Sequence, residues 1–302
     1  MSSTSSTPSL SGAFTALVTP FTPSGDAVDE AALEKLVERQ IAGGIAGLVP
    51  CGTTGETPTL TDAEQVDVIR RTVQAARGRV PVYAGTGSFS TKKTIESSRR
   101  AIEAGATGVM VVMPYYSKPT QDGLVEHVKA VAAAVDAPII LYNIPGRSSI
   151  DLGVEATARI CDACPNVVAT KEATGNVLRC QELKRTLGDR LTVLSGDDGL
   201  TVAMMAVGAA GVISVTSNVL PAAVSNVVAL MLAGKYAEAR AAHFRLVPVH
   251  DAMFIESNPS PVKAVAELRG EMGSGVRLPL VPASAATRER LRAVLATYEA
   301  AK

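Results

Sequence analysis

The chain has 302 residues, of which 47% are hydrophobic and 19% are charged, and its 29 basic and 29 acidic residues cancel to a net charge of zero. This composition excludes a disordered chain, because it supplies ample apolar material for a core. It also argues against a nucleic-acid-binding protein, which needs a basic face. The length suits one large domain such as an α/β barrel, or two small domains.

The amino terminus and the most apolar stretch both argue against export or membrane insertion. The first residues read MSSTSSTPSL, and we expect residues 1–10 to be frayed. They lack the basic start and the apolar run of a signal peptide. The stretch VLPAAVSNVVALMLAG is interrupted by Pro221, Ser225 and Asn226 and is too short to cross a membrane. We therefore expect a cytoplasmic protein.

The four cysteines form no metal-ligand pattern. Cys161 and Cys164 make a lone CxxC, Cys51 and Cys180 stand apart, and the chain has only three histidines. A zinc site needs several ligands at characteristic spacings, and the pair Asp197-Asp198 has no histidine or carboxylate partner at such a spacing. The sequence thus predicts no metal site, and it predicts reduced thiols as in cytosolic proteins.

Short apolar runs alternate with helical patterns along most of the chain. The runs that we expect to be strands are Ala13–Val18, Gly47–Val49, Val82–Ala84, Val109–Val112, Ile139–Tyr142, Val167–Thr170, Leu191–Leu194 and Val212–Val215. The amphipathic stretches between them include Asp29–Ala42, Ala63–Ala76, Thr91–Ala104, Leu124–Val135 and Val177–Leu187. Thr61 and Glu64 form a capping box that opens one of these helices, and glycines such as Gly105 supply helix stops.

Strand and helix that alternate in this way predict parallel strands joined by helical crossovers. Eight such units within about 200 residues match a (β/α)8 TIM barrel, which we place at residues 11–220. A doubly wound open sheet is the alternative, but no Gly-rich dinucleotide fingerprint follows the first strand, where the chain reads TPFTPSGD. The segment 221–302 is helical in pattern and too long for one closing helix, so we expect additional C-terminal helices packed on the barrel.

A lysine, Lys171, ends the expected strand in the segment VVATKEATGN. Lysine is rarely buried without a partner, and burial favours the neutral form of its amine. The neutral amine is what a Schiff-base nucleophile needs. The structural alternative is a strand-end lysine whose amine reaches water or pairs with Glu172. Lys171 taken by itself leaves both interpretations open.

Other chemically active residues follow the ends of the remaining strands, where barrel enzymes place their catalytic residues. Hydroxyls, glycines, one arginine and three of the six tyrosines gather there. The segments are CGTTGET at 51–57, GTGS at 85–88, PYYSKP at 114–119, YNIPGRS at 142–148, SGDD at 195–198 and SVTSN at 214–218. Each segment alone has a structural explanation, as a tight turn, loop packing, a surface ion pair or a solvated turn.

The coincidence of these segments with Lys171 indicates one kind of chemistry. A neutral amine attacks a ketone, and a tyrosine hydroxyl nearby can move the protons that carbinolamine dehydration and enamine formation require. The backbone N–H groups and hydroxyls of the GTTG turn suit a carboxylate. Since nothing in the set resembles a phosphate cradle, we predict a class I aldolase acting on pyruvate or a similar keto acid. Its only covalent group would be the Schiff base with pyruvate on Lys171, with no cofactor.

The motifs GTTGE, PYY, YNIPGR, KEATGN, SGDD and GVISVTSN occur in this order, and NPSPVK follows at Asn258–Lys263. With these motifs the chain resembles the dihydrodipicolinate synthase / N-acetylneuraminate lyase family of class I aldolases, and its dihydrodipicolinate synthase branch above all. The resemblance begins at about Gly12 and continues through the tail. Each motif alone is weak, but their combination is highly specific.

The resemblance implies roles for particular residues. Lys171 corresponds to the lysine that captures pyruvate, and Tyr142 to the proton donor and acceptor beside it. Thr53 and Tyr116 correspond to the rest of a proton relay to solvent. In the family the tyrosine matching Tyr116 is lent by a neighbouring subunit across a dimer interface. Homotetramers, built as a dimer of dimers, are usual in the family, and dimers occur too.

Substrate contacts are implied in the same way. Thr54 corresponds to the residue that binds the pyruvate carboxylate, while Gly196 and Ile213 correspond to backbone carbonyl contacts with the bound substrate. Arg147 corresponds to an arginine that meets the carboxylate of aspartate semialdehyde, and an arginine can hold a carboxylate through two hydrogen bonds. N-acetylneuraminate lyases typically lack an arginine at this place.

The reaction implied is condensation of pyruvate with L-aspartate-4-semialdehyde to 4-hydroxy-tetrahydrodipicolinate, in the diaminopimelate route to lysine. An alternative is another pyruvate-dependent class I aldolase, such as N-acetylneuraminate lyase or a keto-deoxy sugar acid aldolase. A third possibility is a non-catalytic barrel that binds a keto acid. Lys171, Tyr142, Thr53 and Thr54 argue against the third, since a sensor needs no complete proton relay.

One part of the family pattern is missing. Lysine-inhibited members carry histidines after GTTGE, whereas this chain has TPTLTDAEQ, with Asp62 and Gln65. Those members carry an asparagine and a glutamate after GTG, where this chain has Phe89 and Lys93. A cation at Lys93 would repel the ammonium group of a lysine ligand. The sequence thus predicts an enzyme that lysine inhibits weakly or not at all.

Overall fold

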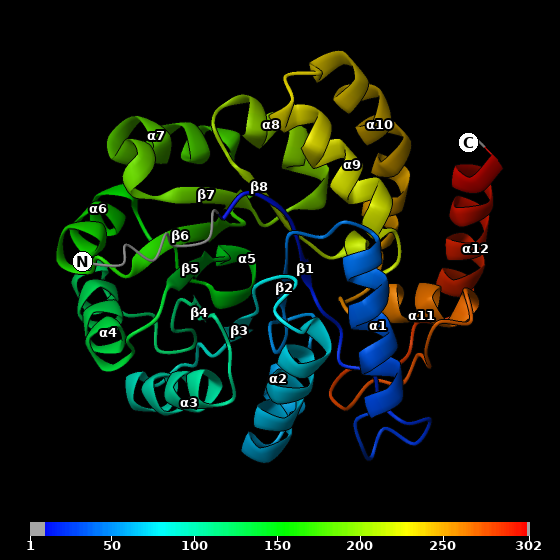
Figure 1. Cartoon of the computed structure of the whole chain (residues 1–302), viewed down its shortest axis with the longest axis horizontal. Helices are drawn as coiled ribbons and strands as arrows, with labels where there is room; N and C mark the ends of the chain where they lie inside the picture. Colours follow the sequence, from blue (N-terminus) through cyan, green and yellow to red (C-terminus); the bar gives the residue numbers. More distant parts are fainter. Residues whose placement is uncertain (1–9, 301–302) are drawn as a thin grey trace.

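A computed structural model of the chain describes residues 10–300. Eight parallel strands curl into a barrel, and helices surround it (Figure 1). The strands are β1 (Gly12–Ala16), β2 (Gly47–Val49), β3 (Tyr83–Gly85), β4 (Gly108–Val112), β5 (Ile139–Asn143), β6 (Val167–Glu172), β7 (Thr192–Ser195) and β8 (Gly211–Ser214). The predicted TIM barrel with additional C-terminal helices is confirmed.

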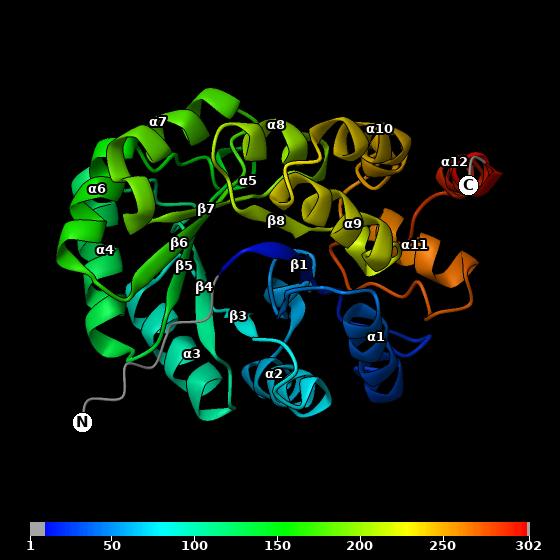
Figure 2. The same ribbon diagram turned by 45° about the horizontal axis from the view of Figure 1, so that its top comes forward.

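The outer ring is formed by the helices that follow the strands along the chain. They are α1 (Glu30–Ala42), α2 (Asp62–Ala76), α3 (Thr91–Glu103), α4 (Gln121–Ala134), α5 (Pro145–Ser148), α6 (Val154–Ala163), α7 (Val177–Leu187), α8 (Thr201–Ala206) and α9 (Pro221–Leu232). Three more helices, α10 (Tyr236–Ala252), α11 (Ser260–Leu268) and α12 (Ala285–Ala300), complete the described chain. In two views α11 and α12 lie on the side of the barrel where α1 and α9 lie (Figures 1 and 2).

The described boundaries stay close to those expected from the sequence. The predicted capping box opens α2: the Thr61 hydroxyl accepts from the Glu64 amide at 3.2 Å, and the Glu64 carboxylate accepts from the Thr61 amide at 2.8 Å. Of the segment 1–10 that we expected to be frayed, residues 1–9 lie outside the described residues. Leu10 is described, and it is buried against the barrel core. No helix of residues 10–300 is long and apolar enough to cross a membrane.

The barrel has one weakly bonded seam, between β2 and β3. The strand order is β2-β1-β8-β7-β6-β5-β4-β3, and a single parallel bridge between Leu48 and Val82 closes it. At the carboxyl end of this seam the loop after β2 passes very close to β3. A Cβ atom on Gly85 would lie 2.2 Å from the carbonyl oxygen of Cys51, so this approach requires a glycine.

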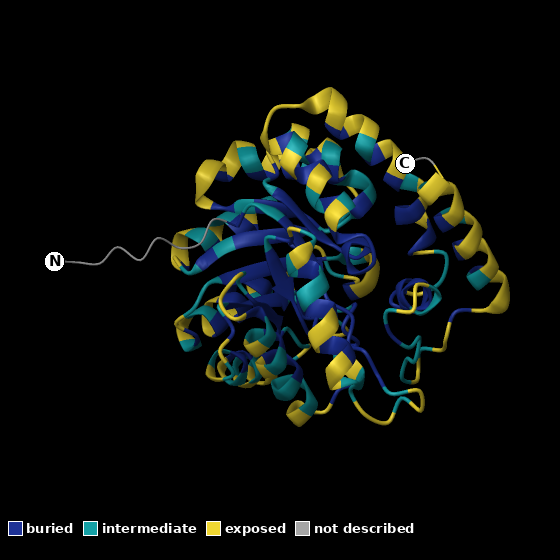
Figure 3. Ribbon diagram, turned by 45° about the vertical axis from the view of Figure 1, so that its right-hand side comes forward, coloured by how far each residue is buried: buried dark blue, intermediate teal, exposed yellow. Residues whose placement is uncertain are grey.

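Side chains along each strand alternate between the barrel interior and the layer under the helices. The interior core includes Phe14, Tyr83, Ile140, Tyr142, Ala169, Leu194 and Ile213. The outward-facing side chains pack against the helices, and Figure 3 shows that the strands are almost entirely buried while the helices expose their outer faces. Because β5 pairs with β6 in a register that joins Tyr142 to Lys171, both of these residues face the interior at the carboxyl end of the barrel.

Candidate active site

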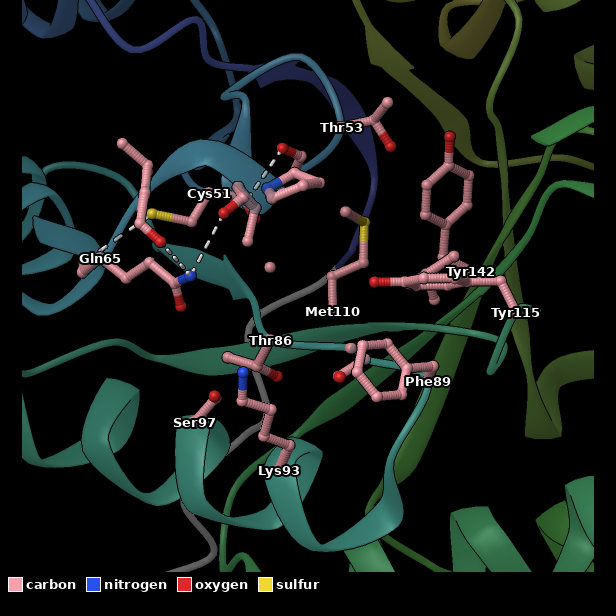
Figure 4. A pocket seen from close by; sticks show the side chains of 18 of the residues that line it. Cys51, Thr53, Gln65, Thr86, Phe89, Lys93, Ser97, Met110, Tyr115 and Tyr142 are labelled. Atoms are coloured by element: carbon pink, nitrogen blue, oxygen red, sulfur yellow. Dashed lines mark hydrogen bonds between the residues drawn. The ribbon is translucent and has the colours of Figure 1, made fainter. Parts of the chain in front are cut away.

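A cavity of about 420 Å³ opens at the carboxyl ends of the strands, on the side of β2, β3 and β5. Thr53, Tyr142 and Arg147 are among the residues that line it. Figure 4 shows Thr53 and the ring of Tyr142 on one side of this cavity, with Lys93 and Ser97 on the opposite side. Three of the predicted site residues, which come from the loop after β2, from β5 and from α5, therefore face one space.

Lys171 lies beside Tyr142 in the barrel. Both side chains belong to residues that are 4% exposed, and the Lys171 Nζ lies 4.3 Å from the centroid of the Tyr142 ring. Within residues 10–300, no carboxylate forms an ion pair with Lys171. The alternative in which Lys171 pairs with Glu172 is wrong, because Glu172 is the next residue along the strand and its side chain points to the other face.

Glu172 instead belongs to a buried network outside the barrel. Its carboxylate accepts hydrogen bonds from the Thr174 amide at 2.8 Å and from Asn143 Nδ2 at 3.3 Å. Burial raises the pKa of Glu172, against the opposing effect of these hydrogen bonds. Asn143 Nδ2 also donates to Asp151 at 2.8 Å, and Asn143 Oδ1 accepts from the Leu152 amide at 3.0 Å. Asn143 therefore joins the end of β5 to β6 and to the connection that leads into α6.

That connection carries Arg147. The residue lies on the single turn of α5, it is exposed, and its side chain lines the cavity. In the described part of the chain no carboxylate pairs with its guanidinium. Arg179 holds the far end of the same connection, donating to both carboxylate oxygens of Asp151 at 3.0 and 2.8 Å. The structure thus presents a guanidinium that is free to bind an anion at the mouth of the cavity.

The GTTGE loop places its two threonines differently. Thr53 is half-buried and lines the cavity, whereas Thr54 is 2% exposed and its hydroxyl accepts a hydrogen bond from Asn258 Nδ2 at 2.9 Å. The loop is bracketed by Cys51 and Glu56, which both have a φ of 55° and so adopt the left-handed conformation. Such conformations persist in non-glycine residues only where the surrounding structure imposes them.

The surrounding structure here is the C-terminal segment. Lys263 of α11 donates to the Glu56 carboxylate at 2.6 Å, and both side chains are 0% exposed. The other Glu56 oxygen accepts from the Arg277 amide at 3.0 Å, and Lys263 also donates to the Gly275 carbonyl at 2.8 Å. Burial lowers the pKa of Lys263 to about 8, against the opposing effect of Glu56. A buried ion pair therefore ties the loop to α11 and to the segment that follows it.

Tyr116 lies apart from the other candidates within this chain. It is 92% exposed and has a φ of 73°, so its loop projects the ring outward. Its neighbour Tyr115 instead lines the cavity and packs edge-on against Phe89, with the ring centroids 5.8 Å apart. The structure does not bring Tyr116 to the cavity of its own subunit.

Gly196 and Ile213 lie at the carboxyl ends of β7 and β8. The Gly196 amide donates to the Glu172 carbonyl at 2.7 Å, and a Cβ atom on Gly196 would meet the Ala173 Cβ at 2.6 Å. Ile213 is 1% exposed and belongs to the barrel core. Gly196 therefore has no side chain and no room for one, the Ile213 side chain contributes packing, and only the backbone of these two residues could contact a ligand.

Sequence reasoning assigned no role to Asn143, Glu56, Asn258 or Lys263, which support the site. Two signals were present. Lys263 interrupts the otherwise apolar run PVKAVA, and Glu56 follows a glycine in a loop whose other side chains are small. What the sequence lacked was any indication that these two residues meet, since they are 207 positions apart.

Neither a reactive thiol nor a metal cluster forms a second centre in the described chain. All four cysteines are free, and burial raises the pKa of the Cys51 thiol to about 12, so this residue beside the cavity is a poor nucleophile. Residues 10–300 contain no group of three or more histidine, cysteine or acidic side chains that could hold a metal ion.

The chain is a parallel (β/α)8 barrel with a buried lysine against a tyrosine ring at the carboxyl ends of its strands, and its similarity to known proteins makes it an enzyme of the lyase class. The model of the dihydrodipicolinate synthetase family matches residues 9–298, and the chain belongs to this family.

Individual relatives agree with this assignment. The chain is 67% identical over 291 residues to the 4-hydroxy-tetrahydrodipicolinate synthase of Sorangium cellulosum, covering 96% of this chain and 97% of that protein. The crystal structure of dihydrodipicolinate synthase from Aquifex aeolicus is 44% identical and superimposes with a TM-score of 0.93, covering 96% of this chain and 98% of that one. The chloride-inhibited enzyme from Acinetobacter baumannii, complexed with pyruvate, is 42% identical with a TM-score of 0.94, covering 96% and 99%.

Proposed function

We propose that this chain is a 4-hydroxy-tetrahydrodipicolinate synthase, which condenses pyruvate with L-aspartate-4-semialdehyde in the diaminopimelate route to lysine. The observation that carries the proposal is the position of Lys171, buried in the barrel against Tyr142 without an acidic partner among the described residues. The relatives named above support the same reaction, and one of them was crystallised with pyruvate.

The chemistry begins at the Lys171 amine. The neutral amine adds to the keto carbon of pyruvate, and the carbinolamine loses water to form an imine. Loss of a methyl proton converts the imine to an enamine, whose carbon attacks the aldehyde of the second substrate. The amino group of that substrate then attacks the imine carbon and releases Lys171 as the ring closes. In this proposal Tyr142, whose ring lies 4.3 Å from the Lys171 amine, moves protons through its hydroxyl, and Thr53 lines the same cavity as Tyr142.

The remaining predicted residues bind substrate in this proposal. Thr54 holds the pyruvate carboxylate, and the backbone carbonyls of Gly196 and Ile213 contact the bound substrate. Arg147 receives the carboxylate of the semialdehyde, since its guanidinium lines the cavity and is free of carboxylate partners in the described chain. We propose no cofactor, because the covalent Schiff base supplies the electron sink.

Tyr116 completes the relay only if another subunit supplies it. Its outward projection and 92% exposure are what a tyrosine lent to a neighbouring active site requires. We propose a homo-oligomer of at least two subunits, in the form of a tetramer built as a dimer of dimers. The free cysteines accord with the reducing cytoplasm, where we place the enzyme.

We also propose that lysine inhibits this enzyme weakly or not at all. Phe89 and Lys93 line the cavity, so the ammonium group of a lysine ligand there would meet the Lys93 cation, while the Asp62 carboxylate of the same cavity is already paired with Arg100 at 3.1 Å. Assays of condensation at increasing lysine test the proposal. Half-inhibition at a sub-millimolar concentration would overturn it.

The first experiment is incubation with pyruvate and borohydride, followed by intact-mass measurement and peptide mapping. We expect a reduced pyruvyl adduct on Lys171, and none on the folded Lys171→Arg variant. Absence of the adduct in the folded unsubstituted protein would remove both aldolase functions and favour the keto-acid sensor.

The second experiment identifies the acceptor. With the adduct established, condensation with aspartate semialdehyde supports the synthase. Cleavage of N-acetylneuraminate or a keto-deoxy sugar acid, without that condensation, would assign the chain to the alternative aldolase class.

A further inference from the structure

The C-terminal segment reaches the active-site loop at one polar contact. Asn258, which is 5% exposed, donates from Nδ2 to the Thr54 hydroxyl at 2.9 Å, across 204 positions of sequence. In the described chain the Thr54 hydroxyl has no other side-chain partner. Asn258 Oδ1 is buried and has no hydrogen-bond partner among the described residues. In the described chain the side-chain amide of Asn258 therefore makes only this one hydrogen bond, and the position of its backbone segment places it against Thr54.

The direction of this hydrogen bond decides what Thr54 can do. A hydroxyl carries one hydrogen and two acceptor lone pairs. When Asn258 Nδ2 donates to it, the Thr54 oxygen acts as acceptor and its hydrogen stays free to donate to an anion. If the Asn258 oxygen faced Thr54 instead, the Thr54 hydroxyl would donate its hydrogen bond to that oxygen. The hydroxyl would then present only a lone pair to the substrate carboxylate, which would repel it.

The ion pair between Lys263 and Glu56 holds together the two segments that meet at this contact. Glu56 lies two residues after Thr54, and Lys263 lies five residues after Asn258. The ion pair and the hydrogen bond therefore link the same two segments a few residues apart. Phe21 lies beneath the ion pair, with Lys263 Nζ at 4.2 Å and Arg277 Cζ at 4.4 Å from its ring centroid. These contacts fix the loop that carries Thr54 and the C-terminal segment that carries Asn258 relative to each other.

We propose that Asn258 is a positioning residue for pyruvate, which sets the Thr54 hydroxyl as a hydrogen-bond donor toward the substrate carboxylate. The inference rests on the proposed role of Thr54, and Asn258 itself acts only through that hydroxyl. It makes the C-terminal segment part of the pyruvate site, although this segment lies outside the eight strands of the barrel.

The test is the pyruvate concentration that gives half-maximal borohydride-trapped adduct on Lys171, because this readout does not depend on the second substrate. Asn258→Ala frees the Thr54 hydroxyl to rotate, so we expect this concentration to rise several-fold. Asn258→Asp is isosteric but can only accept at neutral pH, so we expect a larger rise, of about tenfold or more, as for a lost hydrogen bond to a charged group. The KM for the semialdehyde should change by less than about twofold in both variants.

A double-mutant cycle with Thr54→Val separates positioning from a general structural role. In the Thr54→Val background, either change at Asn258 should add less than about a twofold effect, because the hydroxyl on which it acts is gone. Effects that multiply would overturn the inference, as would an Asn258→Asp variant that binds pyruvate normally.

Asn166→Ala is the matched control. Asn166 donates to the carbonyls of Val135 and Ala132 at 2.9 and 3.1 Å, at the opposite end of β6 from Lys171. Its loss should destabilise the fold without changing pyruvate half-saturation. If that control moves pyruvate binding as much as Asn258→Ala does, stability explains both and the inference fails. An adduct that forms on the unsubstituted protein, together with a normal Thr54→Val variant, would overturn the inference while leaving the aldolase function intact.

Discussion

Replacing Lys263 with methionine should destabilise the protein far more than a surface lysine would. The change leaves the Glu56 carboxylate in a fully buried place, without its 2.6 Å partner and with the Arg277 amide as its remaining donor. It also removes the donor to the Gly275 carbonyl. Breaking a buried ion pair at one partner costs about 3–5 kcal/mol, because a charge is left uncompensated. We therefore expect the free energy of unfolding to fall by about that amount.

Urea unfolding followed by circular dichroism measures this quantity, with Lys129→Met as the matched control. Lys129 pairs with Glu126 at 2.7 Å, but the two side chains are 43% and 67% exposed. An exposed pair contributes about 0–1 kcal/mol, so the control should stay within that range.

The double variant Lys263→Met/Glu56→Gln tests the cause. It removes both charges, so we expect it to recover most of the stability, to within about 2 kcal/mol of the parent. A Lys263→Met variant no less stable than Lys129→Met would refute the reasoning. So would a double variant that loses at least as much stability as Lys263→Met, since uncompensated charge would then not be the cause.

Three further predictions concern the cavity mouth and its supports. Arg147→Ala should raise the KM for the semialdehyde about tenfold or more and leave pyruvate adduct formation unchanged; equal effects on both substrates would contradict the assigned role. Asn143→Ala removes the acceptor of the Leu152 amide and a donor to two carboxylates, so hydrogen exchange at Leu152 should become faster than in the parent; an unchanged rate would show that Asn143 does not hold this connection. The hydrogen bonds from Arg277 lower the pKa of Glu64 to about 2. Because the pKa of Glu64 is lower in the folded state than in the unfolded state, ionised Glu64 stabilises the fold. This stabilisation is fully present above the ordinary pKa of 4.5 and is lost as the pH falls toward 2. Since Glu64 is partly exposed, solvent screening limits the contribution to about 1 kcal/mol, and acid unfolding of Glu64→Gln should lack this component. If stability falls between pH 4.5 and 2 with the same slope in Glu64→Gln as in the parent, Glu64 does not stabilise the fold in this way.

Sequence patterns predicted the barrel because the spacing of apolar residues depends on whether a segment forms a strand or a helix. Alternating apolar runs and amphipathic stretches locate strands and helices, and the ends of parallel strands meet at one edge whatever the loops between them do. Lys171 could therefore be assigned to the carboxyl end of the barrel before any contact was known. The register that joins it to Tyr142 follows from the pairing of neighbouring strands, which the order of the chain already suggests.

The supports of the site depend on contacts that no local pattern encodes. Asn258 meets Thr54, and Lys263 meets Glu56, across more than 200 positions, and each contact exists because α11 packs beside the loop after β2. The outward projection of Tyr116 and the direction of the Glu172 side chain depend in the same way on loop conformation and strand register. The sequence determines which side-chain atoms can donate or accept hydrogen bonds. Only the packing of segments far apart in the chain determines which of these atoms meet.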